Sequence, residues 1–380
     1  MTSGFARKDV TLANWRAAQF SSWSFQNVSE IVPSAVIAGN RIVESPQIGL
    51  GQFASLQVKG VQSEDLLLPG FLAQTDTDSL VIMRRSEFAA EWHAPHCDPQ
   101  KPHLIFSVSK SVAGLLAGIL IGQGAVAETD AVIKHVPEAA GSGFADAALR
   151  HLLDMEVSLD FEENYQAASG DYPRYRRSTL WNPADPAFPQ EDLKTVLCSL
   201  KRGPDPHGMV HIYQSPCTDF AGIVLERASG RRFAELVSEL IWIPMGAHSD
   251  AMVTVDSLGT PRAAGGISAT ARDLARLGDL VRLGGKGIVP SEWIADLWTG
   301  GSRQTWKIGD QADSFPEGSY RSFWYETGHG ELCAIGIHGQ WIWIDPAAET
   351  VIVKLSSHTL PTDDATDAAI VKMLRALCKA

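Results

Sequence analysis

The sequence predicts an α/β (α+β) protein in which both ends of the chain build one antiparallel sheet, flanked by helices, and a mainly helical domain is inserted between them. Two regions lead to this expectation. Residues 79–93 (SLVIMRRSEFAAEWH) contain two short apolar runs around a polar turn, which is the pattern of a hairpin. Residues 339–357 (GQWIWIDPAAETVIVKLSS) repeat this pattern around an Asp-Pro turn, and the sequence between the two regions is mostly helical.

Helical patterns fill the middle of the chain. In residues 270–284 apolar side chains recur at helical spacing, and Thr270 and Asp273 are placed as a capping box. Residues 219–242 predict two further helices that are broken at Gly230.

The alternation of strand and helix patterns divides the chain into two parts. We expect residues 1–110 and 250–380 together to form the sheet-containing α/β domain, and residues 111–249 to form the mainly helical domain. With 380 residues the chain can bury a large core. Ligand sites tend to lie where two such parts meet, so we expect an active-site cleft between them.

Composition and charge exclude several classes of function. The net charge of -12, from 32 basic and 44 acidic side chains, argues against a nucleic-acid-binding surface. The densest cationic patch, RYRR at residues 174–177, is interpreted as a solvated loop. No apolar stretch approaches ~18 residues, and the first 20 residues lack the apolar centre of a signal peptide, so we expect a cytoplasmic protein that does not bind a membrane. Five scattered cysteines without CxxC spacing predict reduced thiols.

Ser107 and Lys110 stand three residues apart just before a long apolar run at residues 112–126. The serine hydroxyl would lie at the first turn of a helix, where free N–H groups favour a developing negative charge, and Lys110 would share its face. In an apolar cleft, desolvation would lower the pKa of Lys110 so that its neutral amine acts as a base. The alternative is a serine near a helix start and a lysine whose ammonium group reaches solvent.

Two further segments accompany this pair. Tyr213 and Ser215 (HIYQSPCTDF) precede another apolar helix and resemble the Tyr-x-Asn/Ser element of penicillin-recognising serine hydrolases. Residues 334–346 (AIGIHGQWIWIDP) resemble the strand that lines the cleft of those enzymes, whose glycines permit close backbone approach. The Lys-Thr-Gly triplet of that strand is missing, and His338 is the residue that would stand in for its basic member.

The chain resembles the class C β-lactamase-like serine hydrolases, and within them the branch of 6-aminohexanoate-dimer (nylon-oligomer) hydrolases and carboxylesterases. The resemblance extends from about residue 30 to residue 358 and implies a β-lactamase/transpeptidase-like fold. The matching segments follow in the order of the family: VPSA, SVSKS, LDMEVSLDFEENY, TVDSLG, GGISATARDLARLG, FPEGSY and GIHGQWIWIDP.

The resemblance implies a role for each matching position. Ser107 would be the acylated nucleophile, with Lys110 and Tyr213 as the proton-transfer pair. The main-chain N–H groups of Ser107 and Ile337 would form the oxyanion hole. The positions that the resemblance assigns to substrate binding are Tyr165, Ser215, Tyr325, His338, Arg176 and Ala264. Neither a cofactor nor a metal is implied.

We therefore expect a serine hydrolase that cleaves small esters through an acyl-enzyme on Ser107. Linear amides such as aminohexanoate oligomers are a second substrate class, but Arg176 would repel an amine-bearing substrate by like charge. The expected partner is a small-molecule ester or amide, and the resemblance also allows a homodimer.

Three other interpretations stay open. A β-lactamase or D,D-peptidase is disfavoured by the missing Lys-Thr-Gly triplet and export signal, and a non-catalytic binding protein by the presence of all three catalytic residue types. By ligand type alone, His93, His96, Cys97 and His103 could hold zinc. The alternating aromatics at residues 341–343 are interpreted as a packed strand.

Overall fold

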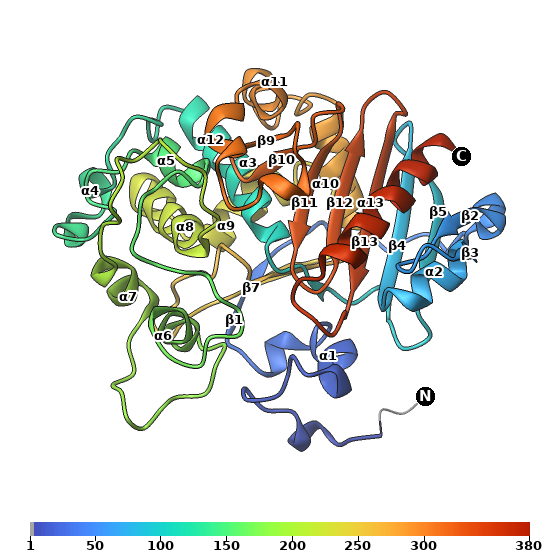
Figure 1. Cartoon of the computed structure of the whole chain (residues 1–380), viewed down its shortest axis with the longest axis horizontal. Helices are drawn as coiled ribbons and strands as arrows, with labels where there is room; N and C mark the ends of the chain where they lie inside the picture. Colours follow the sequence, from blue (N-terminus) through green and yellow to red (C-terminus); the bar gives the residue numbers. More distant parts are fainter. Residues whose placement is uncertain (1–3) are drawn as a thin grey trace.

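A seven-stranded antiparallel sheet forms the larger layer of the protein, as Figure 1 shows for the computed structural model, which describes residues 4–380. Its strand order is β5-β4-β13-β12-β11-β10-β9. The strands are β4 (Thr77–Arg84), β5 (Glu87–His93), β9 (Ser319–Arg321), β10 (Trp324–Glu326), β11 (Leu332–Gly336), β12 (Gln340–Asp345) and β13 (Thr350–Ser356).

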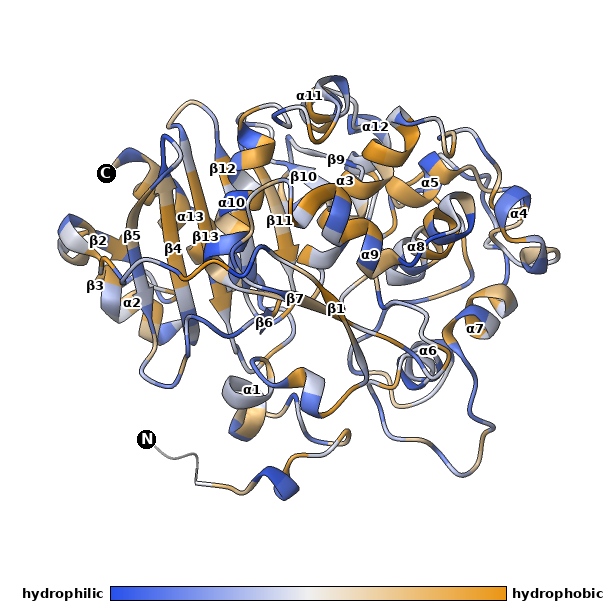
Figure 2. Cartoon of the chain, turned by 180° about the vertical axis from the view of Figure 1, so that it is seen from behind, coloured by the Kyte–Doolittle hydropathy of each residue, from blue (hydrophilic) through white to orange (hydrophobic). Residues whose placement is uncertain are grey.

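The pairing of β4 with β13 confirms that both ends of the chain meet in one sheet. Val81 lies opposite Val353, and Ile82 lies opposite Ile352, so apolar side chains from residues about 270 positions apart share each face. Both faces are covered, because α10 (Ala271–Arg282) packs on one and α13 (Asp364–Lys379) on the other (Figures 1 and 2). Strands covered on both faces need continuous apolar sequence, which explains the runs in β4, β12 and β13.

A smaller sheet holds the segment that leads to Ser107. Its order is β1-β7-β8-β6, and a separate hairpin pairs β2 with β3. These strands are β1 (Ser34–Ile37), β2 (Gln57–Lys59), β3 (Asp65–Leu67), β6 (His103–Leu104), β7 (Ala251–Thr254) and β8 (Ile267–Ala269). Because β6 lies beside β8, the chain that enters the Ser107 helix is fixed against the segment around Ala264.

Helices make up the middle of the chain, and the described part of residues 108–249 contains no strand. The helices there are α3 (Val108–Gly122), α4 (Val132–His135), α5 (Leu149–Leu153), α6 (Asp171–Ser178), α7 (Leu193–Ser199), α8 (Ser215–Ser229) and α9 (Phe233–Val237). The remaining helices are α1 (Ala18–Ser24), α2 (Leu68–Gln74), α11 (Ser291–Thr299) and α12 (Arg303–Lys307). One apolar cluster runs through the helical part and the sheet, so the division at residues 111–249 stays a prediction.

The central helix, α3, is buried along almost its whole length. Its small residues let neighbouring elements approach closely. A Cβ at Gly114 would clash with the carbonyl oxygen of Ser322, and one at Gly118 would clash with the ring of Trp293. These contacts explain why an otherwise helix-disfavouring residue recurs inside α3.

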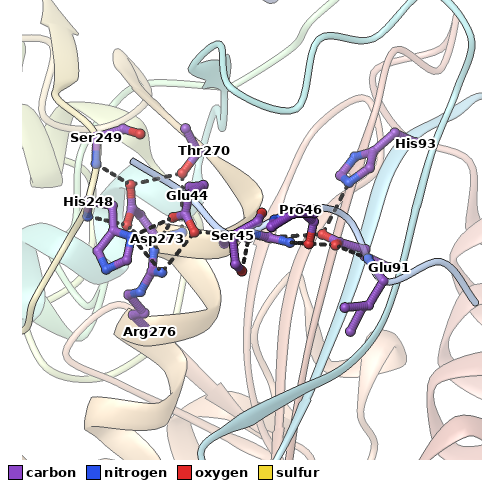
Figure 3. Close-up of polar contacts among 12 residues, drawn as sticks. Glu44, Ser45, Pro46, Glu91, His93, His248, Ser249, Thr270, Asp273 and Arg276 are labelled. Carbon is purple, nitrogen blue, oxygen red and sulfur yellow. Dashed lines mark hydrogen bonds and ion pairs between the residues drawn. The ribbon is translucent and has the colours of Figure 1, made fainter. Parts of the chain in front are cut away.

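Helix α10 begins as expected at Thr270, but the capping box is only half formed. The Thr270 hydroxyl oxygen accepts the backbone N–H of Asp273. The Asp273 carboxylate does not return to the backbone of the cap. It accepts the N–H groups of His248 (2.8 Å) and Ser249 (3.0 Å), which ties α10 to the preceding loop (Figure 3).

A network of ion pairs, called here the α10 charge network, fastens an irregular segment at residues 44–46 to α10 and β5. Its five charged members are Glu44, Glu91, Arg272, Asp273 and Arg276, most of which Figure 3 labels. Although burial opposes ionisation, hydrogen bonds with His93 and Arg272 lower the pKa of Glu91 to about 2. Every cation of the network contacts at least one carboxylate.

The RYRR segment is helical, so the prediction of a solvated loop was wrong. It lies in α6, where Tyr172 and Tyr175 are three residues apart and both buried. The hydroxyl of Tyr175 donates to Asp219, and Arg174 forms two hydrogen bonds with Glu191. The tyrosines give α6 an apolar face, which a count of its charges does not reveal.

Other expectations concern the chain as a whole. All five cysteines are free thiols, as expected. Among the helices of residues 4–380, none combines the length and the apolar character needed to span a bilayer. The aromatic side chains at residues 341–343 are buried, which confirms the packed strand.

Candidate active site

Ser107 stands at a sharp turn from β6 into α3. Phe106 has a left-handed backbone (φ 45°), which is uncommon for a bulky residue and reverses the chain just before the serine. The Phe106 ring is held by Phe25 (4.8 Å between centroids) and Trp181 (5.9 Å). Ser107 is half-buried, whereas the next three residues are buried. The turn therefore presents the hydroxyl at the edge of an otherwise enclosed helix.

Lys110 lies beside this hydroxyl. Its Nζ is 2.8 Å from Ser107 Oγ and 2.8 Å from the carbonyl oxygen of Ala264, and the side chain is 1% exposed. Burial lowers the pKa of Lys110 to about 7, although the carboxylate of Glu163 opposes this shift. Near neutral pH a substantial fraction of the amine is thus uncharged and able to accept a proton from the serine.

Tyr213 completes the group around the serine. The Lys110 Nζ lies 4.9 Å from the centroid of its ring. Burial raises the pKa of Tyr213, while hydrogen bonds with Ser107 and Tyr325 act in the opposite direction. The tyrosine therefore keeps its proton at neutral pH and can donate it, whereas Lys110 is the group that titrates. Tyr325, expected in the substrate pocket, is buried against Tyr320 and contacts the Tyr213 hydroxyl.

Two backbone N–H groups near Ser107 are free to bind an oxyanion. Within residues 4–380, neither Ser107 nor Ile337 donates its N–H to a protein acceptor. The end of β11 lies against the start of α3, because a Cβ at Gly336 would be 3.1 Å from the Ser107 nitrogen. A donor pair on either side of a reacting carbonyl is the arrangement that stabilises a tetrahedral intermediate.

Gln340 braces the turn that carries Ile337. Its buried amide nitrogen donates to the carbonyl oxygens of Ile337 (3.3 Å), His338 (3.0 Å) and Ser356 (2.7 Å). Its amide oxygen accepts the N–H of Ser356 (3.1 Å), which fixes the orientation of the amide. The Nζ of Lys354 donates to the hydroxyl oxygen of Ser356 and so supports the residue that Gln340 contacts. Sequence reasoning missed this brace, although the quoted segment contains Gln340.

His338 does not face the site. Its side chain is 3% exposed, its Nδ1 lies 2.7 Å from the carbonyl oxygen of His358, and its ring packs on Phe106 and Phe25. Burial lowers the pKa of His338 to about 4, so the imidazole is neutral at pH 7. It therefore cannot supply the positive charge of the missing Lys-Thr-Gly triplet, and we assign it a structural role.

Glu163 is a functional candidate that sequence reasoning missed. Its carboxylate accepts the N–H and hydroxyl of Ser215 and the hydroxyl of Tyr165 (3.0 Å). It joins two residues that were expected to bind substrate and raises the pKa of Lys110 by its charge. The segment EENY offers two acidic residues, but no periodicity shows that Glu163 turns inward while Glu162 stays exposed.

Ala264 acts through its backbone. Its carbonyl accepts from Lys110, and its N–H donates to Asp219 Oδ1 (2.7 Å). Asp219 is fully buried and also pairs with Arg262. Because the methyl group of Ala264 is only 1% exposed, the structure gives this residue a part in holding Lys110 instead of the expected contact with substrate.

Two aromatic rings connect Glu163 with Arg176, and the first is that of Tyr165, whose hydroxyl donates to Glu163. The rings of Tyr165 and Tyr172 meet edge to face with their centroids 5.6 Å apart. Arg176 lies over Tyr172, with 5.5 Å between its Cζ and the ring centroid. Both Tyr165 and Arg176 are half-buried, so they can contact a ligand.

The histidines near β5 do not converge on one point. His96 and His103 contact the buried carboxylate of Asp78, at 2.6 Å and 2.9 Å. His93 contacts Ser79 instead. Among the described residues no group of three or more metal-ligating side chains is placed to bind an ion.

Known proteins provide an independent comparison. The sequence profile of the β-lactamase family matches residues 70–376. The chain is 35% identical over 363 residues to the 6-aminohexanoate-dimer hydrolase of Paenarthrobacter ureafaciens. The match covers 93% of this chain and 90% of that protein. A solved structure from Bacillus anthracis, provisionally named a 6-aminohexanoate-dimer hydrolase, matches with a TM-score of 0.88 at 24% identity over 98% of both chains. A family VIII carboxylesterase matches with a TM-score of 0.59 at 13% identity, over 88% of this chain and 100% of its own.

Proposed function

Because the chain belongs to the β-lactamase family and is a hydrolytic enzyme with that fold, we propose that it cleaves small esters through an acyl-enzyme on Ser107. The observation that carries the proposal is the 2.8 Å contact between Ser107 Oγ and the Nζ of a buried Lys110. A lysine desolvated in this way can act as a general base at neutral pH.

Acylation begins when the neutral amine of Lys110 takes the proton of the Ser107 hydroxyl. The serine oxygen attacks the carbonyl carbon of the ester, and the carbonyl oxygen becomes an oxyanion held by the N–H groups of Ser107 and Ile337. Tyr213 then gives its proton to the departing alkoxide and regains one from Lys110. The alcohol leaves, and the acyl group stays on the serine.

Deacylation repeats the same steps with water as the nucleophile. Lys110 and Tyr213 accept the proton of the water, and the second oxyanion occupies the same two N–H groups. Collapse of the intermediate returns the proton to Ser107 and releases the carboxylic acid. Both half-reactions thus use the same three side chains and need no other group.

Linear amides are a second candidate substrate class, which the 35% identity to a 6-aminohexanoate-dimer hydrolase favours. An amide demands protonation of its leaving amine, and Tyr213, which keeps its proton because burial raises its pKa, would supply it. The half-buried cation of Arg176 opposes a substrate that ends in an ammonium group. We therefore expect ester hydrolysis to exceed hydrolysis of the 6-aminohexanoate dimer.

The proposal is tested by comparing hydrolysis of a short-chain p-nitrophenyl ester, the 6-aminohexanoate dimer and a chromogenic cephalosporin. We expect the ester to be cleaved and the Ser107→Ala variant to lose at least roughly 10⁴-fold in turnover. Ser111→Ala is the matched control, because Ser111 lies on the same helix but its hydroxyl donates to the Phe323 carbonyl. Mass spectrometry of a slowly deacylating ester should find the acyl group on Ser107. Unchanged ester turnover in Ser107→Ala would exclude the mechanism.

A further inference from the structure

Arg176 lies at the candidate site without an acidic partner. Its side chain is half-buried, and its contact within the protein is the face of the Tyr172 ring. In residues 4–380 no carboxylate lies within ion-pair distance of its guanidinium group. Burying a charge in this way is costly unless something neutralises it.

A second arginine of the same kind comes from the N-terminal part of the chain. Arg16 donates to the carbonyl oxygen of Trp181 (3.1 Å) and to the side-chain oxygen of Asn182 (2.7 Å), both of which follow α6. No carboxylate of the described residues is within ion-pair distance of Arg16 either. Trp181 and Asn182 in turn donate their N–H groups to the carbonyl oxygen of Arg176 (3.0 Å and 3.3 Å), so Arg16 contacts the segment that is bound to Arg176.

The two arginines of residues 4–380 that are fully buried, Arg262 and Arg272, are paired. Arg262 contacts Asp219, and Arg272 contacts both Glu44 and Glu91. The protein thus neutralises buried guanidinium groups elsewhere. The half-buried Arg84 and Arg177 also lack a carboxylate partner in the described part of the chain, and they lie over the rings of Phe53 and Phe188. Arg176 differs from them in its link to the candidate site through Tyr172 and Tyr165.

Contacts between aromatic rings connect both arginines to the candidate site. On one side, the Tyr172 ring that carries Arg176 is packed against Tyr165, whose hydroxyl donates to Glu163. On the other side, Arg16 lies over the ring of Trp15. Trp15 meets Trp181, and Trp181 meets the ring of Phe106, the residue before Ser107. Both arginines are therefore connected through aromatic rings to residues that adjoin the candidate site, Arg176 to Tyr165 and Arg16 to Phe106.

Glu163 does not take the place of the missing partner. Its oxygens accept three hydrogen bonds, two from Ser215 and one from Tyr165. A carboxylate would complement Arg16 and Arg176 well, since guanidinium groups bind planar anions through paired N–H donors.

We propose that Arg176 and Arg16 bind a carboxylate of the substrate, so that the preferred substrates are esters that also carry a carboxylate group, such as half-esters of dicarboxylic acids. This inference rests on the proposed hydrolysis at Ser107 and adds the class of substrate. The carboxylate can belong to the acyl part or to the alcohol part, and the substrates of the test distinguish the two.

The test compares charged and neutral substrates of equal shape. On the acyl side, the p-nitrophenyl half-esters of glutaric, adipic and pimelic acid are compared with the corresponding monoamides. On the alcohol side, 4-acetoxybenzoate is compared with 4-acetoxybenzamide. We expect kcat/KM to be about 10-fold to 100-fold higher for the carboxylate of one pair, with an optimum chain length if the acyl side is bound.

Variants assign this preference to the two arginines. Arg176→Gln should remove most of it, measured as the ratio of kcat/KM for the half-ester to kcat/KM for its monoamide, and Arg16→Gln should reduce the same ratio. Arg177→Gln is the matched control, because Arg177 is the next residue of the same helix but stacks on Phe188. Arg176→Lys should retain part of the preference, since it keeps the charge without the paired donors.

Equilibrium binding separates this inference from the proposed function. Adipate and its monoamide are titrated by calorimetry into Ser107→Ala, with and without Arg176→Gln, so that no turnover is needed. Tighter binding of adipate that is lost with Arg176→Gln supports the inference even if no ester is hydrolysed. Equal binding and equal kcat/KM for charged and neutral members of both pairs would overturn it, while Ser107-dependent hydrolysis of the neutral esters would leave the proposed function intact.

Discussion

The α10 charge network and the surroundings of Ser107 both contain buried or half-buried charged side chains, but the contacts of these side chains differ. In the network, Arg272 and Arg276 contact two carboxylates each. Around Ser107, Lys110 contacts a hydroxyl and a carbonyl oxygen, and Arg176 lies on a ring face. The first region uses its charges to fasten a loop and keeps them ionised. In the second region Lys110 and Arg176 contact no carboxylate of the described residues, which leaves them free for the proposed reaction and for a bound substrate.

The largest effect on activity is expected for Lys110→Met near Ser107. This substitution removes the proposed base and keeps a side chain of similar volume. Ester turnover should fall by roughly 10²-fold to 10⁴-fold, because the serine loses its proton acceptor. The free energy of unfolding should stay the same or rise, since a buried amine that contacts no carboxylate within residues 4–380 is replaced by an apolar group. Turnover is measured with a p-nitrophenyl ester and stability by urea unfolding. A variant that keeps its turnover would show that Lys110 is not the base.

The opposite outcome is expected for Arg272→Met in the α10 charge network. Removing one partner leaves Glu91 buried with only its weaker partners, so the free energy of unfolding should fall by about 3–5 kcal/mol. The folded fraction should hydrolyse the ester at the wild-type rate, because the network lies outside the site. Urea unfolding and kcat at low temperature check both statements. Arg85→Met is a control for the loss of an arginine, because the ion pair of Arg85 with Glu349 is exposed.

An intermediate effect is expected when the brace of the Ile337 turn is cut. Gln340→Met keeps the length of the side chain but removes all four hydrogen bonds of its amide. We expect kcat to fall by about 10-fold to 100-fold, because the oxyanion donor is less well placed, while KM changes little. A positioning role also predicts weaker binding of a phosphonate transition-state analogue. If the loss of kcat is explained by a smaller folded fraction, and the folded protein binds the analogue as the wild type does, Gln340 only supports the fold.

The smallest change comes from pH, which separates the two regions without a mutation. Lys110 must be neutral to act, so kcat/KM should fall tenfold for each pH unit below its pKa of about 7. Charges that tune this value belong to Glu163, Arg262 and Asp219.

At acid pH the protein should lose its activity before it unfolds. The pKa of Glu91 is depressed to about 2 in the folded protein, so its contribution to stability is complete above the unfolded pKa and is lost as the pH falls towards 2. Activity should therefore disappear between pH 7 and 5 while circular dichroism stays unchanged. Simultaneous loss of both signals would contradict this separation.

Sequence patterns predicted the fold well because its elements depend on local periodicity. The hairpin at residues 79–93 and the helix after Thr270 follow from alternation and helical spacing, which neighbouring residues determine. The candidate site was predicted where a motif names its members, as with Ser107, Lys110 and Tyr213. The structure brings these three together.

The residues that were missed act across long distances in sequence. Glu163 meets Ser215 across 52 positions, and Arg16 meets Asn182 across 166. No periodicity in either segment indicates such a partner, because the contact depends on how distant elements pack. The prediction of a solvated loop at RYRR failed for a related reason. The buried face of this helix consists of two tyrosines, which are covered only in the tertiary structure.

The stacking of Arg16 on Trp15, with 4.8 Å between the guanidinium carbon and the ring centroid, has an optical consequence. The Trp15 indole also meets Trp181 edge to face at 5.4 Å, and Arg262 lies over Trp181. Indole emission responds to nearby charge, so an anion that neutralises Arg16 should change the fluorescence of this tryptophan pair. The chain thus carries its own reporter of occupancy, and a Trp15→Phe variant would reveal which part of the emission belongs to it.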